Sequence, residues 1–212
     1  MQHEYSVLGG INRAAIGRYL SITASAIASA IGAGALAIID LAKSFGFDKQ
    51  VPSMVLWPLT AGVIYTVLYW WFETKFWRWK SVAKLLRVPN LSGTWQCQGQ
   101  TINPDQTLGP VWTGELIVIQ SWDRLRIHSR TPQSRSNSIA AALVHDEADG
   151  YRLLYNYKNE PNIDQPELTA HRGAAELLFD EQLNTARGEY FNGYGRYTFG
   201  TMTLTRGEKI GA

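Results

Sequence analysis

The chain has 212 residues, enough for one or two domains, and its net charge at pH 7 is +2. The charge is divided unevenly, since residues 1–88 hold nine Lys/Arg against four Asp/Glu and residues 89–212 hold eleven against fourteen. The acidic excess of the second part argues against a large nucleic-acid interface, which needs a basic face. The single cysteine, Cys97, excludes an internal disulfide framework and a Cys-based zinc cluster.

Two long uncharged segments lie in the N-terminal part of the chain. Residues 19–39 hold no charge over 21 positions, and residues 50–72 hold none over 23. Because a membrane-spanning helix needs about 20 apolar residues, both segments qualify. We predict a cytoplasmic tail over residues 1–15 and a transmembrane hairpin of two helices over residues 16–72. Neither segment contains the ionisable side chains that transporters and pumps need within the membrane.

The first uncharged segment is rich in small residues. Two rows of small side chains repeat at intervals of four, namely Ala24, Ala28 and Gly32, and Ser25, Ser29 and Ala33. Small residues at this spacing let helix backbones approach closely in lipid. The pattern fits self-association through Ala28, Ser29, Gly32 and Ala33, or a weakly hydrophobic anchor that packs only within its own hairpin.

A basic joint follows the second segment over residues 73–88. Aromatic residues precede it from Tyr69 to Phe72, and five Lys or Arg side chains then accompany one acid, Glu73. Tyr and Trp favour the membrane interface, and Lys and Arg collect on the cytoplasmic side. With Arg13 and Arg18 before the first uncharged segment, the positive-inside rule places both termini in the cytoplasm. We expect this joint to be the only covalent route from the hairpin to residues 89–212.

Residues 89–212 alternate between apolar and polar side chains, as β-strands do. Turn residues such as Asp149-Gly150 and Asn192-Gly193 separate the segments with strand character. There are eight such segments, at about 93–100, 111–120, 124–130, 137–146, 151–158, 169–180, 184–191 and 196–206. They predict a cytosolic all-β domain, either an eight-stranded up-and-down β-barrel or a two-sheet sandwich. An eight-stranded barrel can hold side chains or one small ligand.

The alternation also predicts which side chains point inward. The inward sets are Tyr151, Leu153, Tyr155 and Tyr157; His171, Gly173, Ala175, Leu177 and Phe179; and Arg196, Thr198, Gly200, Met202 and Leu204. One end of the interior is then apolar, and the other is lined by Tyr157, His171 and Arg196. Aromatic walls with few polar groups are typical of a pocket for a small ligand.

The polar stretch from Thr131 to Ser138 has two interpretations. It is a loop between strands, or it is a site whose hydroxyls and Arg135 bind phosphate or ribose oxygens. Similarly, Tyr155, Tyr157 and Trp122 either fill the core or stack on bases.

Two polar residues near the same end also have ordinary structural roles. Asn159 fits a strand-end cap, and His171 is more typical of a hydrogen-bonded interior histidine than of a catalyst. The sequence contains no P-loop, GxSxG, HExxH or CxxC motif, and its four histidines lack metal-ligand spacing. We therefore expect a protein that is not an enzyme and has no metal or cofactor.

Several short motifs occur in a recognisable order. They are the run from Leu91 to Trp95; Gln120 and Trp122; Thr131, Ser134, Ser136 and Ser138; Tyr155, Tyr157, Asn159 and Pro161; His171 and Gly173; Gly188 and Tyr190; and Arg196, Thr198 and Gly200. With the hairpin and the basic joint, they resemble the two-transmembrane β-barrel effectors of CBASS, the cyclic-oligonucleotide-based anti-phage signalling system. These effectors are CD-NTase-associated proteins.

The resemblance implies a location, a ligand and a mechanism. The protein would sit in the bacterial inner membrane and bind a cyclic dinucleotide made by a CD-NTase. Binding would cause self-association, the hairpins would disrupt the membrane, and the infected cell would die before the phage matures. The implied ligand-binding residues are Trp122, Thr131, Ser134, Ser136, Tyr155, Tyr157, Asn159, His171, Arg196 and Thr198. A membrane-anchored, lipocalin-like barrel that carries a lipid or another apolar ligand is the alternative.

Overall fold

The computed structural model describes residues 1–46, 60–194 and 196–207. The chain forms two compact units. One, which we call the sheet unit, contains Met1–Gly10 and Arg78–Ala212, and the other, the helical unit, contains Ile11–Trp77.

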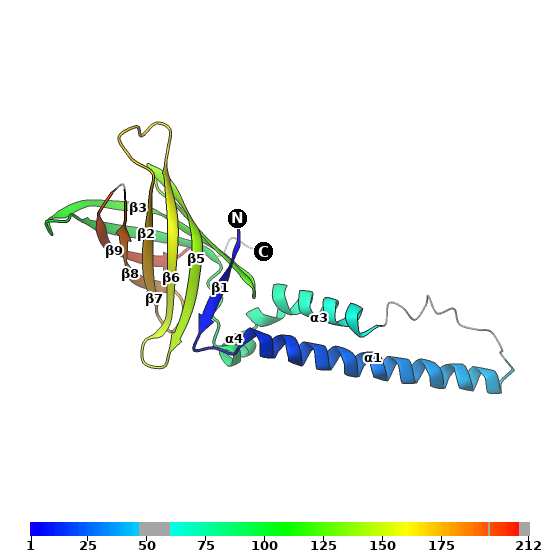
Figure 1. Ribbon diagram of the computed structural model, residues 1–212. Helices are drawn as coiled ribbons and strands as arrows, with labels where there is room; N and C mark the ends of the chain where they lie inside the picture. The colour runs from blue at the N-terminus through cyan, green and yellow to red at the C-terminus, as the bar shows by residue number, and fades with distance from the viewer. Residues whose placement is uncertain (47–59, 195, 208–212) are drawn as a thin grey trace. The chain divides into compact units, whose positions relative to one another are not determined.

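The described residues of the helical unit form two long helices, α1 (Arg13–Ser44) and α3 (Ala61–Thr74), which pack against each other (Figure 1). Asn12 caps α1, since its side-chain oxygen accepts a hydrogen bond from the Ala14 backbone N–H at 2.8 Å. At 1.5 Å per residue, the 32 residues of α1 extend for about 48 Å. Within the described part of the chain, α1 is the one helix whose length and composition suffice to cross a membrane. The other predicted span, residues 50–72, lies partly outside the described residues.

The small side chains of α1 divide between two environments. Ala24 is buried in the helical unit, where α1 packs on α3, and Ala28 is half-buried. Among the described residues, nothing buries Ser29, Gly32 and Ala33, and a Cβ at Gly32 would have no atom of these residues within 4 Å. Among the described residues no segment covers this side of α1, and self-association through it stays a prediction.

Two short helices follow α3, namely the 3₁₀-helix η2 (Phe76–Arg78) and α4 (Lys80–Leu86). Arg87 ends α4 in the left-handed region, at φ 55°. Its backbone N–H donates to the carbonyls of Ala83 and Lys84. The segment expected as a basic joint is thus largely helical.

Eight antiparallel strands follow α4, in agreement with the eight predicted segments. They are β2 (Gly93–Ile102), β3 (Leu108–Gln120), β4 (Arg124–Arg130), β5 (Ser134–Asp146), β6 (Gly150–Pro161), β7 (His171–Phe179), β8 (Thr185–Asn192) and β9 (Phe199–Arg206). Apart from β5 with β4, which pair only near their turn, successive strands are neighbours along most of their length, and β9 returns to pair with β2.

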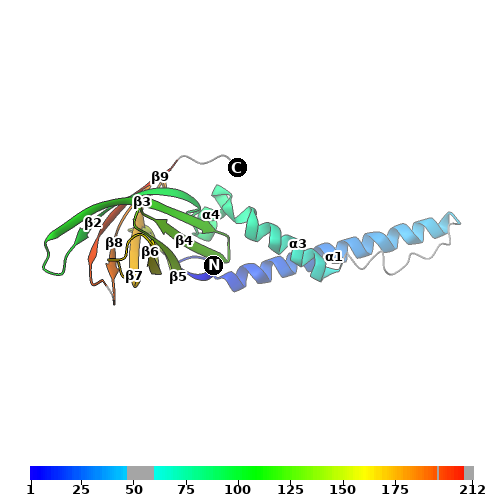
Figure 2. The ribbon, with the colours of Figure 1, turned by 90° about the horizontal axis from the view of Figure 1, so that it is seen from above.

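A ninth strand, β1 (His3–Leu8), completes the sheet. It pairs parallel with β5 and antiparallel with β4, so the hydrogen-bonded sheet closes on itself in the order β1-β4-β3-β2-β9-β8-β7-β6-β5. Figure 1 shows β1 beside β5, and Figure 2 shows the strands around a common interior.

Strand β1 corrects three expectations. Residues 1–15 are not a tail, the described residues form nine strands instead of eight, and the joint is not the only covalent route to the helical unit. Because Tyr5 is the one buried side chain of β1, the segment HEYSVL carries too little hydrophobic alternation to predict a strand.

The interior has two ends that differ in character. At the core end, which holds the β3–β4, β5–β6 and β7–β8 turns, large apolar side chains fill the space. Trp95 and Phe179 meet there edge to face, with ring centroids 5.3 Å apart. Leu153, Leu177 and Leu204 are all 0% exposed, which confirms the predicted inward faces of β6, β7 and β9. We call the opposite end the cavity end.

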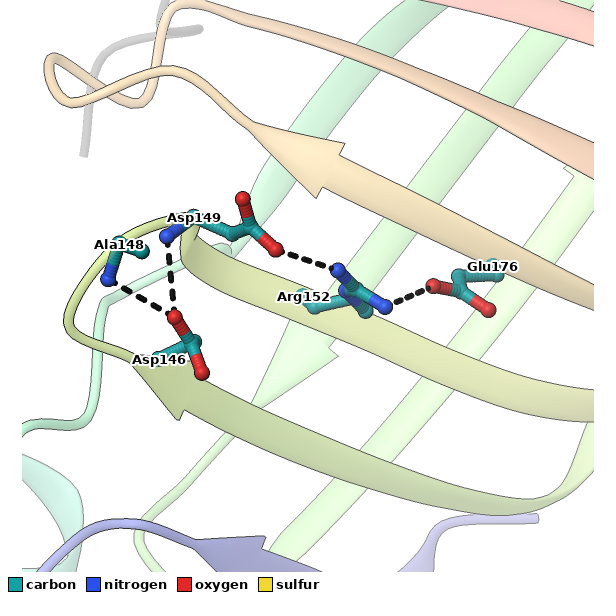
Figure 3. A network of polar contacts seen from close by, with 5 residues as sticks. All are labelled: Asp146, Ala148, Asp149, Arg152 and Glu176. Atoms are coloured by element: carbon teal, nitrogen blue, oxygen red, sulfur yellow. Dashed lines mark hydrogen bonds and ion pairs between the residues drawn. The ribbon is translucent and has the colours of Figure 1, made fainter.

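The β5–β6 turn at the core end is fixed by a network of polar contacts (Figure 3). The Asp146 carboxylate accepts hydrogen bonds from the backbone N–H groups of Ala148 and Asp149, at 2.8 and 3.1 Å. The Arg152 guanidinium bridges the carboxylates of Asp149, at 2.9 Å, and Glu176, at 2.7 Å. These contacts tie the turn to β6 and β7.

Candidate ligand-binding site

A cavity of about 410 Å³ opens at the cavity end of the sheet. It is lined from β2 to β9 and from the β4–β5 and β8–β9 turns. Eight of the ten predicted ligand-binding residues line it: Thr131, Ser134, Ser136, Tyr155, Tyr157, Asn159, His171 and Arg196. Residues that the sequence reasoning did not select also line it, among them Cys97, Thr101, Trp112, Ser129, Gln133, Tyr190 and Asn192.

Aromatic rings form the wall of this cavity, and each of three rings faces a glycine on the adjacent strand. The register pairs are Trp112 with Gly99, Tyr157 with Gly173, and Tyr190 with Gly200. A Cβ on any of these glycines would overlap atoms of the ring or the neighbouring backbone. A glycine inside a strand often marks such a close approach, and this was the available signal for Trp112 and Tyr190.

Hydrogen bonds fix two of these rings to one another. The indole N–H of Trp112 donates to Tyr190 Oη at 3.1 Å, and the ring centroids lie 5.7 Å apart, edge to face. Tyr190 Oη also lies 3.0 Å from Thr101 Oγ1. The wall is therefore held in place without a ligand.

Tyr157 is positioned through Asn192. Its hydroxyl donates to Asn192 Oδ1 at 2.8 Å, and Asn192 Nδ2 donates to Thr198 Oγ1 at 2.8 Å. Thr198, predicted as a cavity residue, thus lies behind Asn192 instead of lining the cavity. The reason is that β9 begins only at Phe199, so the strand alternation does not extend to Thr198.

The polar side of the cavity is built by the β4–β5 turn and β6. The backbone N–H of Ser134 donates to Thr131 Oγ1 at 3.1 Å, and Asn159 Nδ2 donates to Ser134 Oγ at 3.0 Å. The Asn159 Oδ1 atom is buried and has no hydrogen-bond partner. Other atoms of Asn159 line the cavity, whereas this oxygen is enclosed by the protein.

Among the described residues that line the cavity, Arg196 is the only Lys, Arg, Asp or Glu. Burial lowers the pKa of His171 below its ordinary value of 6.5, so this imidazole is neutral at pH 7, and it shares a hydrogen bond of 3.0 Å with the Thr169 carbonyl. Burial also raises the pKa of Tyr157 and raises that of the Cys97 thiol to about 12. The cavity therefore presents one positive charge beside neutral hydrogen-bonding groups.

Trp122 does not belong to this cavity. It follows β3 at the core end, is 1% exposed, and is absent from the cavity lining. The structure places Trp122 in the core, the first of its two predicted roles, because residues after the end of β3 lie at the opposite end from Trp112. Separately, no group of three or more His, Cys, Asp or Glu side chains that could hold a metal ion occurs in the described ranges.

Two family models match this chain. Residues 86–206 match the model described as the Cap15 cyclic dinucleotide receptor domain, and residues 14–78 match the model described as the Cap15 TM helices. The chain belongs to the Cap15 family. The cavity lies within the receptor domain of this Cap15 chain, and α1 and α3 lie within its TM region.

A relative supports the same family over the full length. CD-NTase-associated protein 15 of Yersinia aleksiciae is 43% identical over 204 residues, which are 96% of this chain and 97% of the relative. Among solved structures, a DUF3598-family protein of unknown function from Nostoc punctiforme aligns with a TM-score of 0.30 and 16% identity, over 55% of this chain and 47% of its own.

Membership in the Cap15 family confirms the resemblance seen in the sequence. The chain has a receptor domain for a cyclic dinucleotide and a region that associates with the membrane, and this combination fits a CBASS effector. The matched domain is described as a receptor, and the absence of enzymatic activity stays a prediction.

Proposed function

We propose that this chain is a CBASS effector whose sheet unit, a cytosolic β-barrel, binds a cyclic dinucleotide in the cavity beside Arg196. Binding causes self-association, and the membrane segments then disrupt the inner membrane, with both termini in the cytoplasm. The observation that carries the proposal is the combination of one cation, Arg196, with a wall of aromatic rings.

The phosphates are the part of the ligand that Arg196 recognises. A guanidinium pairs with phosphate oxygens through charge-assisted hydrogen bonds, which are about twice as strong as neutral ones. The cavity lining has no described carboxylate that would repel the phosphates. The hydroxyls of Thr131, Ser134 and Ser136 lie on the same lining and provide further donors.

The bases are the part that the aromatic wall and Asn159 recognise. Trp112, Tyr157 and Tyr190 present rings that the paired glycines and hydrogen bonds hold in place. Stacking of a base on an aromatic side chain contributes about 1–3 kcal/mol. Asn159 lines the cavity, and once its side chain turns toward the ligand, its unpartnered Oδ1 accepts a hydrogen bond from an amino or imino group of a base.

The size of the cavity suits a ligand of this class. Its volume of about 410 Å³ lies within the range of about 300–1,000 Å³ that is typical of small-molecule sites. The lipid-carrier alternative needs a hollow apolar end, but Trp95, Leu153 and Leu177, each 0% exposed, fill that end of the sheet.

The partner that supplies the ligand is a CD-NTase, in keeping with the name of the Yersinia relative. A ligand drives assembly only by binding the assembly-competent state more tightly than the resting state. Ligand binding must therefore change the structure around the cavity, and this change must alter either a surface of the sheet unit or the chain segments that connect it to the membrane segments.

Titration calorimetry of the purified full chain in detergent tests this function. Cyclic dinucleotides of different base composition are compared with the matching linear dinucleotides, and sedimentation measures the mass before and after addition. We expect at least one cyclic dinucleotide to bind and to increase the mass. Absence of binding by the whole set would contradict the proposal, and recovery of a co-purified lipid from the cavity would favour the carrier.

A further inference from the structure

Strand β1 lies between β4 and β5 at the place where these two strands diverge, which we call the fork. These two strands pair from His128–Asn137 to Arg130–Arg135 near the cavity end, and β1 lies between them farther on. There, His3 and Glu4 pair with β4, and Tyr5–Leu8 pair with β5. The parallel pairing with β5 is an exception in an otherwise antiparallel sheet. The direct β4–β5 pairs close the sheet at the cavity end, and farther on its closure depends on the short strand β1.

Ser138 connects this fork to the cavity. Its Oγ accepts a hydrogen bond from the Ile127 backbone N–H at 2.9 Å and lies 2.7 Å from His3 Nε2. Ser134 and Ser136, the preceding inward residues of β5, both line the cavity. The inner face of β5 therefore leads from the ligand site to the first residue of β1.

The side-chain amide of Gln120 joins β1 to the segment that follows α4. This amide, 2% exposed, donates to Tyr5 Oη at 3.2 Å and to the Pro89 carbonyl at 3.1 Å. Its oxygen accepts from the Leu91 backbone N–H at 2.8 Å. Both chain connections toward the helical unit consequently meet at one buried side chain inside the sheet unit.

The contacts of β1 are few compared with those of the strand that supports it. Tyr5 is its one buried side chain, and Leu8 is 53% exposed. The β5–β6 hairpin beside it is fixed by the Asp146 and Arg152 contacts (Figure 3). Segments with little buried apolar surface open at the lowest free energy. Of the neighbouring strands β1 and β5, β1 is therefore the one that detaches from the sheet more easily.

The chain after β1 leads directly to α1. Gly9 has φ +78°, and a Cβ there would overlap the His145 carbonyl, so only glycine fits this turn. Two residues, Ile11 and Asn12, then separate Gly10 from the first residue of α1. A displacement of β1 is therefore passed to α1 through a connection of only four residues, Gly9 to Asn12.

We infer that β1 is a coupling strand, which must leave its place between β4 and β5 before the membrane segments can act. The inference rests on the proposed function, since it makes ligand binding the trigger. Release of β1 also leaves backbone edges of β4 and β5 unpaired, and such edges readily pair with another chain. The release of β1 thus links ligand binding in the cavity both to α1 and to self-association.

A reversible disulfide tests this coupling in the full chain. Ser6 and Ala142 are Cα partners across β1 and β5, and adjacent strands lie within the Cα separation that a disulfide spans. The double variant Ser6→Cys/Ala142→Cys locks β1 when oxidised, and the native Cys97 is buried. The matched control, Gln98→Cys/Thr203→Cys, joins β2 to β9 at exposed partner positions and leaves β1 free.

Calorimetry and dye release from liposomes are measured on the same protein, with the cyclic dinucleotide that the wild type binds. The oxidised lock should bind the ligand like the wild type but release no more dye than without ligand, and reduction should restore release. The control disulfide should have no effect in either state. Ligand-dependent release by the oxidised lock would overturn the coupling role. If no cyclic dinucleotide binds the wild type, the proposed function fails first and the coupling role with it.

Hydrogen exchange of the wild type provides a measurement that needs no variant. Backbone amides of residues 3–8 should exchange faster when ligand is added, whereas those of β7 should not. Unchanged or increased protection of residues 3–8 in the liganded, dye-releasing state would overturn the inference.

Discussion

Gly99 on β2 is the register partner of Trp112 on the adjacent strand β3, and a side chain at Gly99 would overlap the indole ring. The same relationship recurs for Tyr157 with Gly173 and for Tyr190 with Gly200, as register pairs. Glycine weakens a strand, since it has no side chain to pack. Three such glycines surround one cavity. Because they have no side chains, the three rings lie close to the strand backbone and the middle of the cavity stays open.

Replacement of Gly99 by alanine should therefore damage both the fold and the site. The added methyl displaces Trp112, and overpacking of this kind costs about 1–3 kcal/mol of the free energy of unfolding. Denaturant titration and ligand calorimetry measure the two effects. Gly34→Ala is the control, because a Cβ at Gly34 in α1 would have no atom of the described residues within 4 Å. A Gly99→Ala protein with wild-type stability and affinity would show that the ring has room to move.

The charge of Arg196 should be needed for ligand binding but not for folding. Arg196 is exposed at the cavity mouth, and removal of a hydrogen bond to a charged group costs about 1.5–3 kcal/mol. We expect Arg196→Ala to bind the cyclic dinucleotide about 10- to 150-fold more weakly at an unchanged melting temperature. Arg172→Ala, which removes an exposed arginine on β7 that does not line the cavity, should bind normally. Equal affinities of the two variants would remove Arg196 from the site.

Acidification should destabilise the sheet unit through His171. Burial lowers the pKa of His171 in the folded protein, whereas unfolding restores its ordinary value of 6.5. Below that value the unfolded state binds a proton that the folded state does not, so the free energy of unfolding falls as the pH drops. Denaturant midpoints at about pH 7.5 and about pH 5.5 should differ more for the wild type than for His171→Gln. An identical pH dependence of the two proteins would contradict this role.

The exposed small-residue side of α1 should be needed for membrane disruption. Gly32→Leu fills the open space beside Ser29 and Ala33 and should leave ligand affinity intact while abolishing dye release from liposomes. Gly34→Leu makes the same change about 200° around the helix and should retain release. If Gly32→Leu still releases dye, the small residues serve only as an anchor.

The eight strands after α4 could be predicted from the sequence because their inward faces alternate regularly, as Leu153, Tyr155 and Tyr157 do in β6. Strand β1 could not, because a parallel strand with one buried residue depends on partners more than a hundred residues away. Similarly, alternation placed Tyr157 and His171 in the interior but could not assign Trp122 to an end of it. That assignment depends on which turns share an end, a property of the closed sheet as a whole.

Dye release from liposomes that contain the wild-type chain tests the central claim most directly, namely that a cyclic dinucleotide in the Arg196 cavity switches on membrane disruption. Release should be absent without ligand, should rise over the same concentrations at which calorimetry shows binding, and should need more ligand for Arg196→Ala. Release that is independent of ligand, or no release at saturating ligand, would contradict it.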